Sequence, residues 1–424
     1  MYIKNNTKME EKLVKEYIEK ANPWWTEKFN VPWFKEREVY NYIIKFLKTR
    51  QIIALNGLRR VGKTSIIKKI IEENLDKGFP KMNIFYFSFD DFSNIRIMDI
   101  LVIYEGVIEK KLKDEKFIIA FDEIQKLDNW SEQLKVVYDL YPNIKFIISG
   151  SESLFIKKKS KESLAGRIFE FKIDPLNFKE YLLFRNIKIE NIWLEREIII
   201  KEFLGYIKNN GFPEIIDEEE EIVEKYIKEG VIEKIIYRDI PEVFQVRDPG
   251  LMKSLFDVIY NHPGQIIQIQ DLASELKVSR QILSTYLNYL EDSYLIRKLY
   301  NFSKNARKIQ RKLKKYYPII VNPLLIKNDF SKIFEQIIIN ELKGEFFWRD
   351  VYKNEVDLIL IKPEFIAIEI KSGEIKEKDL FSLEKFIKKY KPKKTMVISY
   401  NIEKKIKNID IVPFYKYLLG KTKK

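Results

Sequence analysis

The chain has 424 residues, of which 46% are hydrophobic, so it is long enough to form two or three folded domains. It has no cysteine and one histidine, which excludes cysteine-based zinc sites and thiol nucleophiles and leaves little room for histidine-based triads. Lys and Arg outnumber Asp and Glu by 77 to 63, a net charge of +14 that favours an anionic partner. No apolar stretch reaches the roughly 18 residues of a membrane span, so we expect a cytoplasmic protein with no membrane segment.

The first motif in the chain is a glycine-rich loop, GLRRVGKT, at residues 57–64, between an apolar run at 51–55 and a helical pattern at 65–75. Its order is that of a phosphate-binding loop, G-x-x-x-x-G-K-[ST]. The glycines let the backbone curl so that its N–H groups face phosphates, and the start of the helix adds a positive dipole end. We therefore predict that ATP is bound by Gly57, Leu58, Arg59, Arg60, Val61, Gly62, Lys63, Thr64 and Ser65.

A magnesium ion and an activated water molecule are expected beside this loop. Lys63 is predicted to reach the β and γ phosphates, and the Thr64 hydroxyl is predicted to ligate Mg²⁺. The apolar run at 117–121 is typical of a strand buried on both faces, and it ends in Asp122 and Glu123. We expect Asp122 to hold Mg²⁺ through water and Glu123 to orient and polarise the attacking water.

Two further residues are candidates for contacts with the phosphates. The apolar run at 145–148 ends in Ser149, which we predict to be a polar sensor between the acid-bearing and phosphate-bearing strands; the alternative is a helix N-cap or turn serine. Arg167 is a candidate for the γ-phosphate, from within the chain or across a subunit interface, because its planar guanidinium matches phosphate oxygens. The alternative is an ordinary surface arginine. These elements place the nucleotide-binding domain, with its N-terminal arm, at residues 1–175, followed by a helical lid at 176–248.

Residues 249–328 carry the pattern of a winged helix. Three short helical patterns at 252–261, 269–276 and 280–290 include a helix-turn-helix unit, whose second helix is capped by Ser279. Strands at 294–296 and 316–321 then enclose a basic loop, and from 297 to 317 there are nine Lys or Arg and no acid. Such a segment would follow a phosphate backbone, so we predict a nucleic-acid partner, DNA rather than RNA. The alternative is a packing or protein-interaction module.

Residues 329–424 offer a second chemistry. Glu335 lies in a helical pattern at 333–342, Asp357 precedes an apolar strand at 358–361, and Glu369 and Lys371 end the strand at 365–370. Acids on adjacent strands can hold Mg²⁺ at a phosphodiester, while a lysine two residues after Glu369 lies on the same face and can position water. The alternative is a surface strand with charged ends.

Taken together, GLRRVGKTS, FDEIQ, ISGSES, LAGR, GFPE, NEVD and EIK resemble the prokaryotic AAA-type ATPases that carry a C-terminal PD-(D/E)xK nuclease-like domain. The resemblance implies an α/β fold: a P-loop NTPase domain of the additional-strand type, a helical lid, a winged helix and a C-terminal α/β restriction-endonuclease-like domain. It also implies ATP at the glycine-rich loop, Mg²⁺ at Asp122, and a nuclease-fold site at Glu335, Asp357, Glu369 and Lys371. The residues NPWW at 22–25 also resemble the start of some of these proteins, and the resemblance implies a strap that packs on the ATPase core. Asn322 departs from the pattern, which often has Asp there.

The sequence leaves two functions open. In the first, the protein is an ATPase that couples hydrolysis to nucleic-acid binding, and its C-terminal site cuts nucleic acid with Mg²⁺. In the second, it is an ATP-dependent switch or scaffold for protein partners, and the nuclease fold is a module that does not cleave. An oligomer is compatible with both, since Arg167 is a candidate for action across a subunit interface.

Overall fold

The computed structural model describes residues 2–32, 34–92, 94–150, 163–244, 246–305, 309, 313–322 and 329–420, with side chains from residue 11 onward. The chain divides into two compact units, Met1–Asp174 and Pro175–Lys424. Within the described ranges, no helix is long and apolar enough to cross a membrane.

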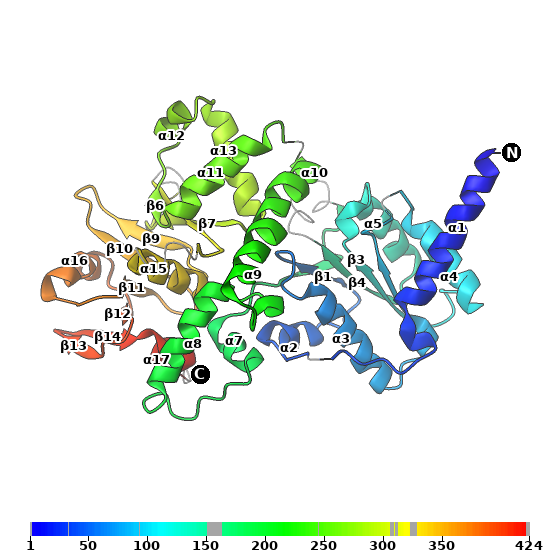
Figure 1. Ribbon diagram of the computed structural model, residues 1–424, viewed down its shortest axis with the longest axis horizontal. Coiled ribbons are helices and arrows are strands. Elements are labelled where there is room, and N and C mark those ends of the chain that lie inside the picture. Colours follow the sequence, from blue (N-terminus) through cyan, green and yellow to red (C-terminus); the bar gives the residue numbers. More distant parts are fainter. Residues whose placement is uncertain are drawn as a thin grey trace. The chain divides into compact units, whose positions relative to one another are not determined.

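The first unit is built on a sheet of five parallel strands in the order β2-β3-β4-β1-β5 (Figure 1). The strands are β1 (Ile52–Asn56), β2 (Ile84–Ser88), β3 (Phe117–Asp122), β4 (Ile144–Gly150) and β5 (Ile168–Lys172). Nearly every residue of β1 to β4 is buried, which is why these strands appear in the sequence as continuous apolar runs. The order confirms the predicted additional strand, because β4 lies between the acid-bearing β3 and the loop-bearing β1.

Helices cover the sheet of the first unit. They are α1 (Tyr2–Ala21), η1 (Pro23–Trp25), α2 (Glu38–Ile44), α3 (Lys63–Asp76), η2 (Lys81–Asn83), α4 (Ile97–Ile108), η3 (Ile124–Lys126) and α5 (Trp130–Leu140). In α3 the residues Ile66, Ile67, Ile70 and Ile71 are buried, the spacing of one helix face against the core. This packing fixes the start of α3, and with it the end of the phosphate loop.

The second unit opens with a helical segment. Its elements are α7 (Phe178–Phe184), α8 (Arg196–Asn209), η5 (Pro213–Ile215), α9 (Glu220–Lys225), η6 (Tyr226–Glu233), η7 (Ile235–Asp239) and α10 (Ile240–Phe244). Asn177 and Glu180 form a capping box that fixes the start of α7. The turn at Gly211 has φ 65°, and a Cβ there would lie 2.3 Å from the carbonyl oxygen of Leu176. The Gly-Phe-Pro-Glu motif therefore begins with a tight turn whose first two residues, Gly211 and Phe212, are buried.

The elements described next are α11 (Pro249–Asn261), β6 (Gln265–Ile266), α12 (Ile269–Glu275), α13 (Arg280–Asp292), β7 (Ile296–Asn301) and β8 (Lys314–Pro318). The Ser279 hydroxyl accepts from the backbone N–H of Ile282 at 3.2 Å, which confirms the predicted cap of α13. The predicted returning strand at 316–321 is shifted, since β8 begins at Lys314 and ends at Pro318. Arg307, Lys308, Arg311 and Lys312 of the predicted basic loop lie outside the described residues.

The remaining elements form the C-terminal part: α15 (Phe330–Glu341), β9 (Phe346–Arg349), β10 (Glu355–Leu360), β11 (Ile366–Lys371), η9 (Glu377–Leu380), α16 (Phe381–Tyr390), β12 (Lys394–Ser399), β13 (Lys404–Ile406), β14 (Ile409–Pro413) and α17 (Phe414–Leu419). Their strands and β6 to β8 make one nine-stranded sheet, in the order β13-β14-β12-β11-β10-β9-β7-β8-β6. The two groups join where β7 pairs in parallel with β9, with Tyr300 opposite Phe346.

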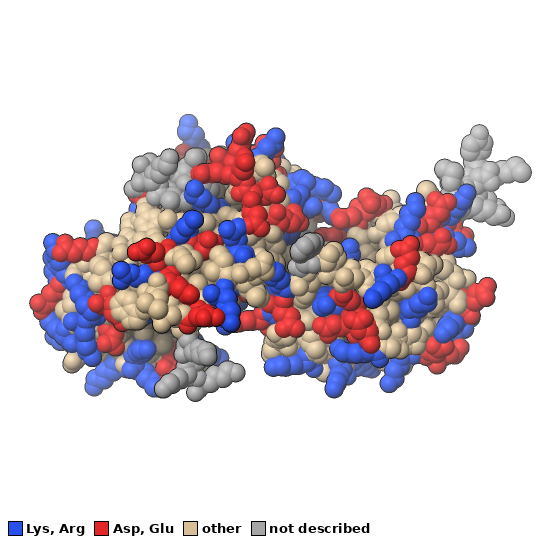
Figure 2. All heavy atoms as spheres, turned by 60° about the horizontal axis from the view of Figure 1, so that its bottom comes forward, with Lys and Arg blue, Asp and Glu red and all other residues tan. Residues whose placement is uncertain are grey.

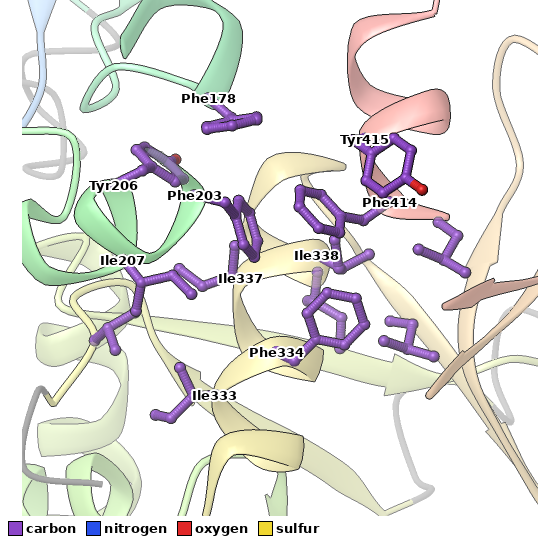
Figure 3. Packing of buried hydrophobic residues seen from close by; sticks show 14 of the residues in the cluster. Phe178, Phe203, Tyr206, Ile207, Ile333, Phe334, Ile337, Ile338, Phe414 and Tyr415 are labelled. Carbon is purple, nitrogen blue, oxygen red and sulfur yellow. The ribbon is translucent and has the colours of Figure 1, made fainter. Parts of the chain in front are cut away.

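One hydrophobic cluster of the second unit joins the helical segment to the C-terminal part (Figure 3). A second cluster, which includes Trp348 and Phe386, lies within the C-terminal part. The ring of Phe203, in the helical segment, packs at a tilt of 31° against Phe414 of α17 with centroids 4.0 Å apart. It also meets the ring of Phe334 of α15 edge to face at 6.2 Å. The same cluster includes Leu299 from β7 and Tyr317 from β8. Burying one such aromatic side chain contributes about 2 to 3 kcal/mol. This cluster therefore crosses the boundaries expected at 248 and 328, and those domain limits stay predictions.

Glu341, the last residue of α15, ties that helix to the helical segment. Its carboxylate accepts from the backbone N–H of Phe178 at 3.1 Å and from the Tyr206 hydroxyl. Burial raises the pKa of Glu341 from 4.5 to about 7. The folded protein therefore keeps this proton at a pH where the unfolded chain loses it.

We predict that the second unit becomes less stable as pH rises, because the folded protein binds the proton of Glu341 more tightly than the unfolded chain does. The stabilisation is complete below pH 4.5 and is lost as pH passes through about 7, because only the unfolded chain ionises Glu341 freely between those values. The loss should be about 3 kcal/mol at most, and Glu341→Gln should abolish it. Chemical denaturation at pH 5 and pH 8 measures it, with the exposed Glu345→Gln as control. Equal pH dependence in Glu341→Gln and wild type would contradict the assignment.

Candidate functional site

The predicted phosphate loop joins the carboxyl end of β1 to α3, which begins at Lys63. Gly57 has φ 155°, and a Cβ there would lie 2.1 Å from the carbonyl oxygen of Ile173. Gly62 has φ 95°, in the left-handed region that favours glycine. The first glycine is therefore required by a close backbone approach and the second by its dihedral angle.

Lys63 lies against the loop that it follows. Its ammonium group is buried and donates to the carbonyl oxygens of Gly57 and Leu58, each at 2.9 Å. These bonds hold the ammonium group of Lys63 against the backbone of the loop. An anion at the loop would offer the same charge a stronger partner.

The other loop residues divide between core and surface. Leu58 and Val61 are buried and anchor the loop by their side chains, whereas Arg60 and Ser65 are exposed and Arg59 is half-buried. A phosphate loop binds through backbone N–H groups, so these side chains can differ in exposure without changing the contact with a ligand.

Arg37 supports the loop from the N-terminal segment, a role that was not predicted. Its guanidinium donates to the carbonyl oxygen of Val61 at 3.0 Å and to that of Asp174 at 2.9 Å. These bonds tie the loop to the residue that ends the first unit. An arginine before a short helix has no distinctive motif, so no local pattern could have indicated it.

Asp122 is a buried acid whose two carboxylate oxygens both accept hydrogen bonds. It is 3% exposed, and its Oδ2 accepts from the Thr64 hydroxyl at 2.6 Å and from the Tyr86 hydroxyl at 2.8 Å. Its Oδ1 accepts from the Ser149 hydroxyl. Burial, and then the charge of Glu123, raises the pKa of Asp122. The hydroxyl of Thr64 and the carboxylate of Asp122 are hard oxygen ligands of the kind that Mg²⁺ prefers, so the predicted pair fits that ion.

Ser149 and Tyr86 approach Asp122 from the two strands beside β3. Ser149 is fully buried at the end of β4, where the predicted sensor should lie. Tyr86 comes from β2 and was not predicted, because a tyrosine in an apolar strand looks like an ordinary core residue. Burial, and then the negative charge of Asp122, raises the pKa of Tyr86, so its hydroxyl keeps the proton that it donates.

Glu123 begins a tight turn after β3 and has φ 50°. Its Oε2 accepts from the Gln125 side-chain amide at 2.5 Å. Asp90, after β2, is a second acid near this turn: burial, followed by the charge of Glu123, raises the pKa of Asp90, and Arg59 opposes that shift. The acids therefore gather at the carboxyl ends of β2 and β3, beside the phosphate loop.

Arg167 lies at the opposite edge of the sheet from the phosphate loop, which corrects one alternative of the prediction. It precedes β5, whose Ile168 is opposite Ile52, whereas the loop follows Asn56 at the other end of β1. Five strand residues separate the two ends by roughly 16 Å. Its guanidinium donates to Asp139 at 3.0 and 3.1 Å. The γ-phosphate contact within one chain is therefore wrong, and action across a subunit interface stays a prediction.

The four predicted residues of the C-terminal site come together in the second unit. The β10–β11 ladder ends at the pair Leu358 and Ile368, and Asp357 and Glu369 lie directly beyond it. Asp357 accepts from the backbone N–H of Ile370 at 2.8 Å. The Lys371 ammonium group lies 2.8 Å from Oε1 of Glu369. Glu335 of α15 is close enough for its charge to act on both acids.

Lys315 also enters this cluster, whereas the sequence pattern placed it in the exposed basic loop. Its ammonium group, on β8, lies 2.5 Å from Glu355 and 3.5 Å from Glu335, and the side chain is 6% exposed. Two residues on, the Tyr317 hydroxyl donates to Glu335 at 2.5 Å. The correction follows from the earlier start of β8, which places residue 315 in the strand. Residues 315 and 317 are two apart and therefore lie on the same face. Only the period of two between them could have indicated it.

The cluster has an excess of negative charge. Its four acids are Glu335, Glu355, Asp357 and Glu369, and its three bases are Lys315, Arg349 and Lys371. Burial, and then the charges of Glu369 and Glu335, raises the pKa of Asp357 well above its ordinary range. A cation, including a proton, is therefore the ligand that this cluster would stabilise.

Glu369 provides a test of whether a metal ion fits. Its Oε2 is buried and has no hydrogen-bond partner among the described residues, so one carboxylate oxygen is available to a cation. In the same part of the chain, however, no three acidic or histidine side chains are spaced to hold a metal ion together. With the lysines in place, Asp357 and Glu369 supply a partial ligand set for Mg²⁺.

The glycine-rich loop, the acids at the strand ends and the strand order define a P-loop domain of the AAA type, and residues 49–182 match the family model described as AAA domain. Residues 200–319 and 330–417 match two models described as domains of unknown function, DUF8612 and DUF4143.

The chain belongs to the family of an uncharacterized protein of Methanocaldococcus jannaschii, with 31% identity over 91% of this chain and 92% of that protein. A second uncharacterized protein of the same organism is 28% identical over 91% of this chain and 90% of its own length. Among solved structures, AMPPCP-bound DnaA from Aquifex aeolicus is similar with a TM-score of 0.28 and 14% identity, over 63% of this chain and 92% of that one.

Gly57→Ala should destabilise the phosphate loop by about 2 kcal/mol or more, because the new Cβ meets the Ile173 carbonyl and φ 155° is strained for alanine. Thermal unfolding of the full chain measures this. Gly106→Ala is the matched control, since a Cβ there has nothing within 4 Å and the residue lies inside α4. Equal melting temperatures for the two variants would contradict the close approach.

Proposed function

We propose that this protein is a magnesium-dependent ATPase that couples ATP hydrolysis to nucleic-acid binding. The observation that carries the proposal is the pair formed by Thr64, at the end of the phosphate loop, and the buried Asp122, 2.6 Å apart. A hydroxyl and a carboxylate at this point are the protein ligands of the metal in P-loop NTPases. The match to an AAA domain supports the same class.

The residues of the site then have separate roles. The backbone of residues 57–64 and the ammonium group of Lys63 bind the phosphates. Ser149, whose hydroxyl donates to Asp122, is the polar sensor of the terminal phosphate. Thr64 and Asp122 hold Mg²⁺, which neutralises charge on the phosphates when it is bound. Glu123 orients and polarises the attacking water, and Gln125 holds its carboxylate when the water is absent.

Substitution at Glu123 should separate binding from hydrolysis. Glu123→Gln should keep ATP affinity and lower kcat by a factor of about 100 or more, because only the water-orienting group changes. Lys63→Ala should lower ATP affinity about tenfold or more. ATP hydrolysis and binding of a fluorescent ATP analogue measure the two effects. The exposed Glu132→Gln is the control.

The same assay tests coupling to nucleic acid when single- and double-stranded DNA are added at two salt concentrations. Turnover that depends on Glu123, rises with DNA and falls at higher salt supports the proposal. Glu123→Gln that hydrolyses at the wild-type rate removes the role of that residue. Turnover indifferent to DNA removes the coupling and favours a protein partner.

The nucleic-acid part of the proposal rests on α12 and α13. Their turn contains Lys277 with φ 54°, and Arg280 and Gln281 are exposed at the start of α13. In a helix-turn-helix, the first residues of the second helix contact base edges. Net charge adds little support, since Figure 2 shows acidic and basic side chains interspersed over the face that it draws.

The C-terminal cluster supports phosphodiester cleavage as a second activity. Asp357 and Glu369 would contribute to holding Mg²⁺, and Lys371, 36% exposed and paired with Glu369, would position water. The alternative is a module that does not cleave, in an ATP-dependent switch or scaffold for protein partners. The alternative is favoured by Lys315 and Lys371, whose ammonium groups already pair with the acids.

Asp357→Ala should abolish magnesium-dependent nicking of plasmid DNA if the cluster cleaves, and agarose gels measure the loss of supercoiled substrate. Glu364→Ala changes a half-buried acid before β11 that pairs with Lys393, and it should nick as wild type does. Nicking that is equal in wild type and Asp357→Ala, or absent from wild type, excludes cleavage by this cluster and leaves the binding module.

A further inference from the structure

The edge strand β2 of the first unit has an unusual cover. An edge strand presents unpaired backbone N–H and C=O groups, and proteins commonly protect them. Here the cover is made of side chains from the N-terminal arm, residues 17–25. Trp24 and Trp25 donate their indole N–H groups to the carbonyl oxygen of Ile84 at 3.1 and 3.0 Å. The Tyr17 hydroxyl accepts from the backbone N–H of Ser88 at 3.3 Å.

Asn22 makes the central contact of this cover. Its side-chain oxygen accepts from the backbone N–H of Tyr86 at 2.7 Å, and its amide donates to the carbonyl oxygen of the same residue at 3.0 Å. The amide also donates to the carbonyl oxygen of Ile18, at 2.7 Å. Asn22 is 1% exposed, so these bonds are shielded from water. A single side chain therefore pairs with Tyr86 as a neighbouring strand would.

Tyr86 connects this edge to the nucleotide site. Its backbone faces Asn22, and its hydroxyl donates to Oδ2 of Asp122 at 2.8 Å, the oxygen that also accepts from Thr64. The other Asp122 oxygen accepts from Ser149. The carboxylate is thus held in one orientation by hydroxyls from β2, β4 and the phosphate loop. The bond from β2 leads back to the N-terminal arm, because Asn22 pairs with the backbone of Tyr86.

We propose that Tyr86 is a positioning residue of the nucleotide site: its hydroxyl holds Asp122 toward Thr64, and the arm, through Asn22, fixes Tyr86 in place. The proposal rests on the ATPase function proposed above. Its consequence is that the arm, which precedes every motif of the site, sets how well Asp122 and Thr64 act together on a metal-bound nucleotide. Displacing Asn22 should weaken that action without touching the phosphate loop.

The test compares Tyr86→Phe with Tyr104→Phe in the full chain. Tyr104 is a matched control: it is a buried tyrosine packed on the same strand through Phe85, and its hydroxyl donates to the carbonyl oxygen of Met82 at 2.5 Å, away from Asp122. Affinity for a fluorescent ATP analogue is measured with Mg²⁺ and with EDTA. The ratio of the affinity with Mg²⁺ to the affinity with EDTA should fall about tenfold in Tyr86→Phe, because one hydrogen bond to a charged group is lost. The affinity in EDTA should stay at the wild-type value. Tyr104→Phe should change neither.

Asn22→Leu provides the second arm of the test. It should reproduce the Tyr86→Phe phenotype, and the double variant should be no worse than either single one, because both remove the same support. The melting temperatures of Tyr86→Phe and Tyr104→Phe are compared as well. If both fall equally, a change in magnesium-dependent affinity that occurs only in Tyr86→Phe is due to lost positioning and not to lost stability.

Three outcomes overturn the inference. A wild-type magnesium response in Tyr86→Phe, or a stronger one, shows that the hydroxyl does not position Asp122. Additive effects of Asn22→Leu and Tyr86→Phe show that the arm acts separately. A wild-type protein that binds no nucleotide overturns the proposed ATPase function together with this inference, and that result is distinct from a change confined to the variants.

Discussion

A buried carboxylate is the constraint on which the first unit depends. Asp122 lies at the end of β3, between β2 and β4, in a sheet whose interior is apolar. A buried charge there is costly without partners. Thr64, Tyr86 and Ser149 provide them. The three hydroxyls belong to the phosphate loop, to β2 and to β4, so the acid requires these elements to meet at one point. The strand order β2-β3-β4-β1 brings them there.

The second unit also buries carboxylates, and there their partners are lysines instead of hydroxyls. Its acids at the open end of the β10–β11 ladder are partnered by Lys315 from β8 and Lys371 from β11. Breaking one side of such a buried ion pair usually costs more than the pair contributes, because the remaining charge stays buried. The cluster is therefore tied to the nine-stranded sheet that brings β8 beside the C-terminal strands. Any activity of these acids depends on β8 as well as on the strands that carry them.

The polar groups of the two units are suited to different ligands. In the first, the acids lie beside a loop whose backbone can face an anion, and Lys63 is held by carbonyls that a phosphate could replace. In the second, lysines already neutralise most of the acid charge, and Glu369 keeps one buried oxygen without a partner among the described residues. The first arrangement is suited to binding an anionic ligand with its cation. The second is suited to a single added cation.

Local chemistry determined much of this protein from sequence. Gly57 and Gly62 are dictated by backbone geometry that few other residues accept, and Asp122, Glu123 and Ser149 end apolar strands, so the phosphate loop and its neighbours were predictable. The tertiary structure alone decided the rest. Arg167 lies at the far end of its strand, Tyr86 and Asn22 act through an edge that only the folded sheet defines, and Lys315 joins the acids because β8 starts earlier than its apolar residues suggest. Motifs report contacts within a few residues, whereas these partners are brought together by strand order and register.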